Sequence, residues 1–357
     1  MVVIGVDPHK RQHTAAVVEQ PTQRQLGELT IEATLADYRR LLAWARQWPE
    51  RTWAVENARG LGRHLAQWLL VRGERVQDVP ATATTRVREL SRGGRRKNDV
   101  IDAAAAASVA ALHGDATSVI AEEDTTAVLA LLDERRVNLA AQRTRLVNQL
   151  HALLRDLLPG GAPTKLTADQ AAALLRPIRP ARTVERTRKD LAREMITELR
   201  GVDARLKHSE QRIREVVASS NSRLCEVDGV GPVLAARVLG RTGTASRFPS
   251  GSHYASYTGT APIEVASAEH ARHRLSRSGD RQLNSALHLV AVTQVRMSNA
   301  EGHAYFGRKI DEGKTRSEAL RCLKRRIAAH LWGIMLADER RARATAAPPP
   351  DVGMSCA

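Results

Sequence analysis

The sequence predicts a mixed α/β domain at the N-terminus and helices in the rest of the chain. Residues 2–6 and 51–55 are apolar runs of strand length, and such runs suit strands that are buried on both faces of a sheet. From residue 122 onward, apolar residues recur at helical spacing. We therefore expect an α/β domain over 1–118, a helical connector over 119–218, a helical domain over 219–340 and a disordered Pro/Ala tail over 341–357.

Each of the two apolar runs ends in an acid, Asp7 in the first and Glu56 in the second. Between them, residues 14–18 and 29–31 are predicted as strands of a meander, and residues 34–48 as a helix. If the two apolar strands lie side by side and parallel, both acids project from the carboxyl edge of the sheet. This is the edge where open α/β sheets build their sites.

A second pair of acids, Asp99 and Asp102, opens an alanine-rich run over 103–107. Residues spaced i and i+3 share one face of a helix, and the helix dipole favours acids in the first turn. Hard divalent ions prefer oxygen ligands, and two of them can assist both the attacking and the leaving oxygen of a phosphodiester. Together the four acids predict a Mg²⁺ (or Mn²⁺) site, although each alone is also explained as a strand-end turn residue or a helix cap.

The composition predicts a polyanionic partner. Lys and Arg number 55 against 39 Asp and Glu, a formal net charge of +16. Nucleic acid fits this charge better than a membrane, because no apolar stretch reaches spanning length, and we see no signal peptide. With five Trp, four Tyr and two Phe, base stacking would be sparse and phosphate contacts should dominate affinity.

Cysteine and histidine offer no metal site of their own at the level of sequence. Three scattered cysteines, Cys225, Cys322 and Cys356, are too few for a disulfide framework and indicate a reduced, cytoplasmic protein. His9 and His13 lie near Asp7 and are interpreted as polar loop or strand residues.

Six basic residues precede the second acid pair. Beside a carboxylate cluster they would draw a phosphate backbone toward the site, although such a run is also explained as a solvated face. These residues are Arg86, Arg88, Arg92, Arg95, Arg96 and Lys97.

Two long helical stretches follow, separated by a break at residues 159–161. They predict a coiled coil or a dimer-forming hairpin, with an intramolecular helical bundle as the alternative. Next, Gly229-Val230-Gly231 before a small-residue helix predicts a helix-hairpin-helix, whose glycines would let backbone N–H groups approach a DNA phosphate. An ordinary tight turn is the alternative. Residues 263–279 form a polar, basic segment, and residues 316–336 a basic amphipathic helix.

In this order the motifs resemble those of the IS110-type transposases, over residues 1 to about 335. The resemblance rests on Gly5-Val6-Asp7, Val55-Glu56-Asn57, Asn98-Asp99-Val100-Ile101-Asp102, Gly229-Val230-Gly231-Pro232, Phe248, Tyr257-Thr258-Gly259-Thr260-Ala261-Pro262 and Ser276-Arg277-Ser278-Gly279.

The resemblance implies a DEDD domain with the RuvC-like, RNase H-type fold, a coiled-coil connector and a C-terminal transposase domain. It implies a recombinase that excises and inserts an insertion sequence, with Asp7, Glu56, Asp99 and Asp102 holding Mg²⁺ or Mn²⁺. The better understood members are guided by a bridge RNA that pairs with donor and target DNA. Since strand exchange needs several active sites held together, we also expect a homo-oligomer, a dimer or tetramer, associated with the nucleoid.

The resemblance further implies a serine nucleophile that forms a covalent link to DNA, and counting from Pro262 places it at Ser267. No His/Asp partner for this serine is evident, so metal held by the acids is its expected activator. Arg272, Arg274 and Arg277 would neutralise the scissile phosphate. Because Ala268 stands where a glycine is common, Ser276 and Ser278 remain alternatives, as do Tyr254 and Tyr257 under a tyrosine-recombinase interpretation.

The sequence thus predicts a metal-dependent, RNA-guided DNA recombinase. Two alternatives remain open. One is a junction-resolving nuclease that uses the acids and an activated water but no serine. The other is a non-catalytic nucleic-acid scaffold in which the acids are structural.

Overall fold

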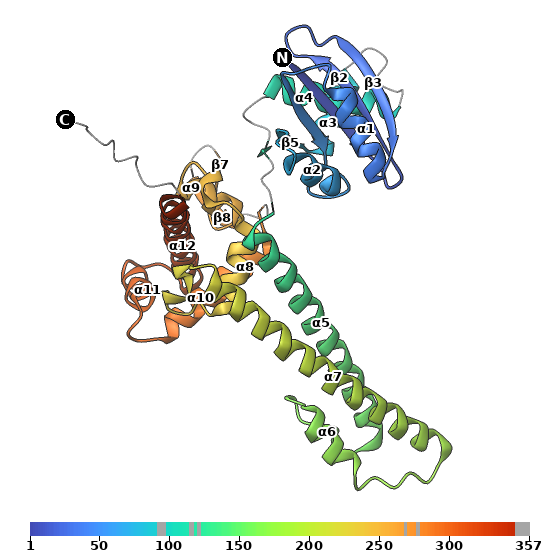
Figure 1. Ribbon diagram of the computed structural model, residues 1–357. Helices are drawn as coiled ribbons and strands as arrows, with labels where there is room; N and C mark the ends of the chain where they lie inside the picture. Colours follow the sequence, from blue (N-terminus) through green and yellow to red (C-terminus); the bar gives the residue numbers. More distant parts are fainter. Residues whose placement is uncertain (91–97, 114–117, 120–122, 268–269, 276–278, 347–357) are drawn as a thin grey trace, which may run out of the picture. The chain divides into compact units, whose positions relative to one another are not determined.

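The computed structural model describes residues 1–90, 98–113, 118–119, 123–267, 270–275 and 279–346. The chain divides into two compact units, residues 1–123 and residues 124–357 (Figure 1). This division does not separate the expected connector from the C-terminal domain, so the domain boundaries at 118 and 218 stay predictions.

Within the described residues, a six-stranded mixed sheet forms the centre of the N-terminal unit, in the order β3-β2-β1-β4-β5-β6 (Figure 1). Strand β1 is parallel to β4, and β4 to β5, whereas the other neighbouring pairs are antiparallel. The strands are β1 (Val2–Pro8), β2 (Gln12–Glu19), β3 (Gln25–Glu32), β4 (Arg51–Glu56), β5 (Val76–Val79) and β6 (Ser118–Val119).

Helices cover both faces of this sheet, because alternate residues of a strand point to opposite faces. Ile4 and Trp53 pack with α1 (Leu35–Ala45) and α2 (Arg63–Leu70) on one face. Val3 and Ala54 pack on the other face, where α3 (Ala81–Leu90) and α4 (Asp99–His113) lie. The result is a three-layer α/β/α arrangement.

The predicted fold class is confirmed for this unit to the extent that it is a mixed α/β domain with helices on both faces of the sheet. Residues 51–56 form the expected second buried strand, and it lies parallel to the first with Val6 opposite Val55. The two strands of the meander also form as predicted, with β2 and β3 antiparallel to their neighbours.

Helix α4 lies directly against β1 at Gly5. A Cβ atom at this position would fall 1.9 Å from the carbonyl oxygen of Ala103 and 2.6 Å from the backbone nitrogen of Ala107. Only a glycine permits so close an approach of helix backbone to strand backbone. The contact fixes where the first turn of α4, and with it Asp99 and Asp102, comes to lie beside the end of β1.

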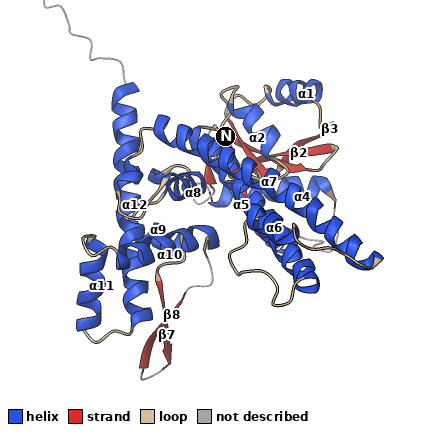
Figure 2. Cartoon of the chain, turned by 90° about the horizontal axis from the view of Figure 1, so that it is seen from below, coloured by secondary structure: helices blue, strands red, loops and turns tan. Residues whose placement is uncertain are grey.

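The C-terminal unit is mainly helical (Figure 2). Its elements are α5 (Thr125–Leu157), α6 (Ala168–Leu175), α7 (Thr183–Ser219), the 3-10 helix η2 (Arg223–Glu226), α8 (Pro232–Thr242), the 3-10 helix η3 (Ala245–Arg247), α9 (Gly251–Tyr257), β7 (Pro262–Ser267), β8 (His270–Leu275), α10 (Arg281–Arg296), α11 (Glu301–Asp311) and α12 (Arg316–Ala346).

Helices α5 and α7 pair with each other as an antiparallel hairpin (Figure 1). Three ion pairs set the antiparallel register: Arg136–Glu210 at 2.9 Å, Arg143–Asp203 at 2.6 Å and Arg188–Asp156 at 3.2 Å. Far from the helical domain, the hairpin and α6 share an apolar core that includes Leu150 and Leu199. Part of the apolar stripes is therefore buried within the chain, whereas Leu131 of α5 and Leu191 of α7 are exposed, and association with a second copy stays a prediction.

At its other end the hairpin merges with the C-terminal helices. Leu129 of α5 and Ile213 of α7 belong to the same core as residues of α8, α10 and α12. Asp133 of α5 also receives two hydrogen bonds from Arg237 of α8, at 2.9 and 3.0 Å, and the Asp133 side chain is buried. Such a bidentate pair fixes the angle between two helices more tightly than apolar contact does.

Three local expectations differ from the structure. The segment expected as polar and basic over 263–279 contains a β-hairpin, β7–β8, with Ser267 opposite His270. The last helix does not end at Leu336 but continues to Ala346, past the expected start of the tail at 341. The element before Gly229 is the short 3-10 helix η2, and an α-helix begins only after Gly231.

A search of the described helices found none with both the length and the apolar character that crossing a bilayer requires.

Replacing Gly5 with Ala should destabilise the N-terminal unit by about 1–3 kcal/mol, because the added methyl group collides with the α4 backbone. Urea unfolding of the variant would measure the loss. Gly27→Ala is the matched control in the same sheet, since a Cβ there meets only the rings of Trp44 and Trp48 at 3.4 Å or more. Equal stability of Gly5→Ala and the wild type would contradict the close approach.

His13 should make the stability of the N-terminal unit depend on pH. The ring is buried, its Nε2 lies 3.0 Å from the Tyr38 hydroxyl, and burial lowers its pKa below the ordinary value of 6.5. The unfolded chain therefore binds a proton first, and stability should fall as pH drops below about 6.5. Comparing the free energy of unfolding at about pH 7.5 and 5.5 should give a smaller difference for His13→Gln than for the wild type. Equal differences would contradict this role.

Candidate functional site

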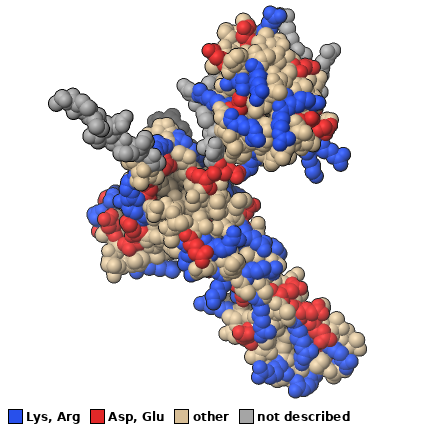
Figure 3. Space-filling model, in the orientation of Figure 1, with Lys and Arg blue, Asp and Glu red and all other residues tan. Residues whose placement is uncertain are grey.

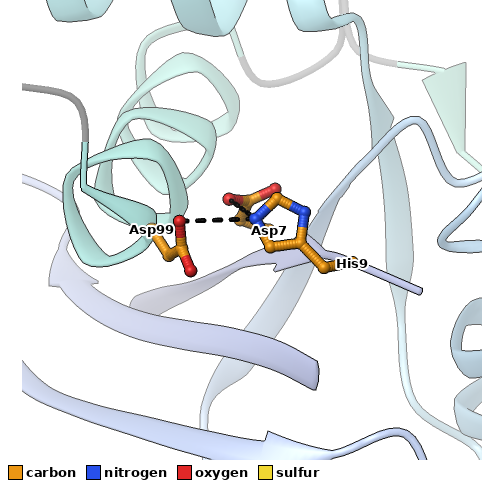
Figure 4. A group of neighbouring side chains, drawn as sticks. All are labelled: Asp7, His9 and Asp99. Carbon is orange, nitrogen blue, oxygen red and sulfur yellow. Dashed lines mark ion pairs between the residues drawn. The ribbon is translucent and has the colours of Figure 1, made fainter. Parts of the chain in front are cut away.

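Asp7, His9 and Asp99 come together at the carboxyl edge of the sheet (Figure 4). The His9 ring lies between the two carboxylates, with its Nε2 3.5 Å from Asp7 Oδ2 and 3.3 Å from Asp99 Oδ1. Asp7 is buried at the end of β1, whereas Asp99 and His9 are about half exposed. The group therefore has a buried floor and an open side.

Glu56 and Asp102 belong to the elements that form this edge. Glu56 follows Val55, which pairs with Val6, so Glu56 stands beside Asp7 on the neighbouring strand. Glu56 also has the same strand parity as Ala54, which faces α4. Asp102 is 6% exposed and lies one helical turn after Asp99. All four predicted acids therefore lie on the α4 side of the sheet, at its carboxyl edge.

The loop after Glu56 is held in one conformation by its backbone. Asn57 has φ +49°, in the left-handed region that non-glycine residues seldom adopt. Its carbonyl oxygen accepts hydrogen bonds from the N–H groups of Gly60 and Gly62, at 2.8 and 3.2 Å. Asp78 accepts the N–H of Ala58 at 2.8 Å. This network fixes the chain directly after Glu56. Asn57 belongs to a motif named from the sequence, but the hydrogen bonds of the loop were not predicted.

The three clustered side chains have the chemistry of a divalent metal site. One ligand atom from each lies within 4.8 Å of the others. Carboxylate oxygens suit Mg²⁺ and Mn²⁺, and an imidazole nitrogen is a common ligand of transition metals. His9 was interpreted as a polar loop residue because nothing in the sequence places it beside Asp99, a contact that depends on how α4 lies on β1.

Of the basic residues predicted to approach nucleic acid near these acids, Arg92, Arg95, Arg96 and Lys97 lie outside the described residues. Lys and Arg side chains spread over the face of the N-terminal unit seen in Figure 3, whereas they alternate with Asp and Glu along the α5–α7 hairpin. Residues 1–123 hold 17 Lys and Arg against 15 Asp and Glu, and residues 124–357 hold 38 against 24, so most of the net charge of +16 lies in the C-terminal unit.

The predicted nucleophile, Ser267, is the last residue of β7 in the C-terminal unit. In the β7–β8 register Arg272 stands opposite Val265 and Arg274 opposite Ile263. Arg277, Ser276 and Ser278 lie outside the described residues. The acids belong to the N-terminal unit and Ser267 to the C-terminal unit.

Neither tyrosine alternative has a free hydroxyl group. Tyr254 is 0% exposed, its hydroxyl lies 2.9 Å from Thr242 Oγ1, and burial raises its pKa well above the ordinary value. Tyr257 donates its hydroxyl hydrogen to the carbonyl oxygen of Arg241 at 2.9 Å. Both side chains serve the packing of α9 against α8.

The Gly229-Val230-Gly231 hairpin is packed on one side and open on the other. Gly229 has φ +80°, and a Cβ there would meet Thr293 at 3.2 Å, while Gln294 Nε2 donates to the Asp228 carbonyl oxygen at 2.8 Å. A Cβ at Gly231, the residue before α8, would meet nothing within 4 Å. Gly231 is exposed at the start of α8, and its contact with a DNA phosphate stays a prediction.

Two family models of transposases match the chain. The family model of the DEDD transposases of IS110 type matches residues 4–159, and that of the transposase IS116/IS110/IS902 family matches residues 221–307.

Proteins of insertion elements match almost the whole chain. The uncharacterized protein of insertion element IS116 from Streptomyces clavuligerus is 27% identical and aligns with 97% of this chain and 96% of its own length. That of IS900 from Mycobacterium paratuberculosis is 26% identical over 93% and 94%. The Thermus thermophilus RuvC structure in complex with a Holliday junction substrate matches 34% of this chain and 99% of its own, at 17% identity and a TM-score of 0.28. With both family models matched in order and relatives aligned along nearly its full length, the chain belongs to the IS110 family of transposases.

Proposed function

We propose that this transposase is a DNA recombinase that cuts and rejoins DNA with a divalent metal ion at the acids and Ser267 as the nucleophile. The observation that carries the proposal is the convergence of Asp7, Asp99 and His9 at the sheet edge, with Glu56 and Asp102 on the same side. Acids from three distant parts of the chain lie at one edge of the sheet, and a bound cation would offset the repulsion between their like charges.

Different residues of the chain would bind the metal ion and neutralise the phosphate. Asp7, Glu56, Asp99 and Asp102 would hold Mg²⁺ or Mn²⁺, and a bound ion would stabilise the negative charge that builds on the scissile phosphate. Arg272 and Arg274, which precede and follow His273 on the strand paired with β7, would neutralise the same phosphate.

The reaction would keep the number of phosphodiester bonds constant, because the broken DNA bond is replaced by a bond to the serine. The Ser267 hydroxyl would give up its proton to solvent as its oxygen bonds to the scissile phosphorus, and the deoxyribose oxygen on the other side would leave and take up a proton. Attack by a hydroxyl group of a second strand would then release the serine and seal a new junction. Because exchange joins two DNA sites, several copies of the chain would act together.

A structured guide RNA would supply the sequence specificity. The family resemblance implies it, and the net charge of +16 supports binding of a large polyanion. Sequencing the nucleic acid that co-purifies with the protein tests this part. A single defined RNA species is the expected result, and nucleic acid of random sequence would contradict it.

His9 should contribute to metal binding as a nitrogen ligand. The His9→Ala variant should bind Mn²⁺ more weakly, with a smaller effect on Mg²⁺, because imidazole suits transition metals better than Mg²⁺. Titration followed by Mn²⁺ electron paramagnetic resonance and by calorimetry measures both affinities. Asp7→Asn should weaken both ions, and His208→Ala, on the exposed side of α7, is the control. Tighter metal binding by His9→Ala would mean that His9 merely occupies the place of the ion.

Two substitutions separate recombination from its alternatives. Asp102→Ala and Ser267→Ala should each abolish recombination between donor and target DNA, and Ser267→Ala should also abolish the covalent protein–DNA adduct. The measurement is recombinant product and adduct in a reconstituted reaction.

The outcomes discriminate clearly between the candidate functions. Full recombination by Ser267→Ala would remove this serine as the nucleophile. Cleavage that fails only in Asp102→Ala would indicate a hydrolytic nuclease of the junction-resolving kind. Activity unaffected by either substitution would leave a nucleic-acid scaffold.

A further inference from the structure

The two ends of the β7–β8 hairpin meet at a pair of glycines. The segment that enters β7 turns at Gly259, with φ +66°, and the segment that leaves β8 passes through Gly279, with φ +115°. A Cβ at Gly279 would fall 2.7 Å from the Gly259 nitrogen, so the two backbones touch. The Asp280 N–H also donates to the Tyr257 carbonyl oxygen at 2.8 Å. We call these two flanking segments, residues 257–261 and 279–280, the stem of the hairpin. The stem joins the hairpin to α9 and α10.

A half-buried amide holds the entering side of the stem. Asn284 of α10 donates from its Nδ2 to the carbonyl oxygens of Thr258 and Gly259, at 3.0 and 2.9 Å. An amide that makes both bonds must point its nitrogen toward the stem and its oxygen away from it. The orientation of Asn284 therefore decides whether the stem is clamped.

Lys324 of α12 fixes that orientation. Its Nζ donates to Asn284 Oδ1 at 2.6 Å, a bond that only the amide oxygen can accept. Lys324 is 7% exposed, and burial lowers its pKa. Among the described residues, no carboxylate pairs with its ammonium group. A buried lysine of this kind costs stability, so its presence calls for a role other than packing.

A second contact holds the leaving side. Asp280 caps α10 by accepting the N–H groups of Gln282 and Leu283, both at 2.9 Å, and it forms an ion pair with Arg241 of α8. Elements α8, α9, α10 and α12 thus all meet at the base of one hairpin. A loop that only connected α9 to α10 would need no such convergence.

We propose that Lys324 and Asn284 are positioning residues, which together clamp the stem of the β7–β8 hairpin and so hold Ser267 in the orientation needed for attack on DNA. The inference rests on the proposed role of Ser267. It predicts that loosening the clamp slows the covalent step without weakening DNA binding, because neither residue needs to touch DNA.

The substitution Asn284→Asp tests the clamp and still leaves the Lys324 ammonium group with a hydrogen-bond acceptor. The new carboxylate can pair with the ammonium group, so the fold should persist, but it cannot donate to the two carbonyl oxygens. Lys324→Met tests the other member, since it keeps the apolar stem of the side chain and removes the donor that orients Asn284. Lys324→Gln restores an N–H donor on a side chain one bond shorter, and it should recover part of the loss.

Three readouts on the full chain separate positioning from general damage. The single-turnover rate of adduct formation should fall by about tenfold to a hundredfold in Asn284→Asp and Lys324→Met, as expected for a misplaced reacting group. The dissociation constant for donor DNA should change by less than about twofold, because phosphate contacts dominate that affinity. Hydrogen exchange should accelerate at residues 257–267 and 279–284.

Asp338→Asn is the matched control. Asp338 of α12 accepts hydrogen bonds from Arg223 and Ser222 in the same unit, away from the stem, so its loss should lower stability without changing exchange in the stem or the rate of the covalent step. An unchanged adduct rate in both clamp variants would overturn the inference. An adduct formed by Ser267→Ala would instead overturn the proposed function, whatever the clamp variants do.

Discussion

The site of the N-terminal unit depends on the packing of α4 on β1: the helix backbone lies against the strand where Gly5 has no side chain. An ordinary residue there would push the helix away from the strand by at least the radius of a methyl group. The carboxylates of Asp7 and Asp99 come from these two elements, and His9 reaches both. The packing of the helix backbone on the strand therefore brings two negatively charged side chains close together.

Local patterns in the sequence predict the main strands of this unit but not the contacts between distant residues. The apolar runs at residues 2–6 and 51–55 and the acids after them predicted two parallel strands with a charged edge, because strand burial and parity are local properties. The contact of His9 with Asp99 was not predictable in this way, because it depends on a helix placed ninety residues later in the chain. The left-handed conformation of Asn57 likewise follows from its partners at Gly60 and Gly62 and not from its own preference.

In the C-terminal unit the helices were predictable and the hairpin was not. Leucines at helical spacing indicated α5 and α7, and their pairing within the chain required the matched ion pairs that only the structure reveals. Segment 263–279 is so rich in charge that its alternation of Ile263 and Val265 did not suggest strands. The clamp at its base joins Thr258, Asn284 and Lys324 from three helices or turns, so no window of sequence contains it.

In both units the proposed reactive groups are positioned by residues that take no part in the reaction. Gly5 lets α4 place Asp99 near Asp7, and Asn284 and Lys324 hold the stem of the hairpin that carries Ser267. The most direct measurement of the central claim is the anomalous scattering of Mn²⁺ in crystals of the full chain. Our account predicts a peak about 2.0–2.2 Å from carboxylate oxygens of both Asp7 and Asp99. A well-ordered site with no metal at these two residues, under conditions that support recombination, would contradict it.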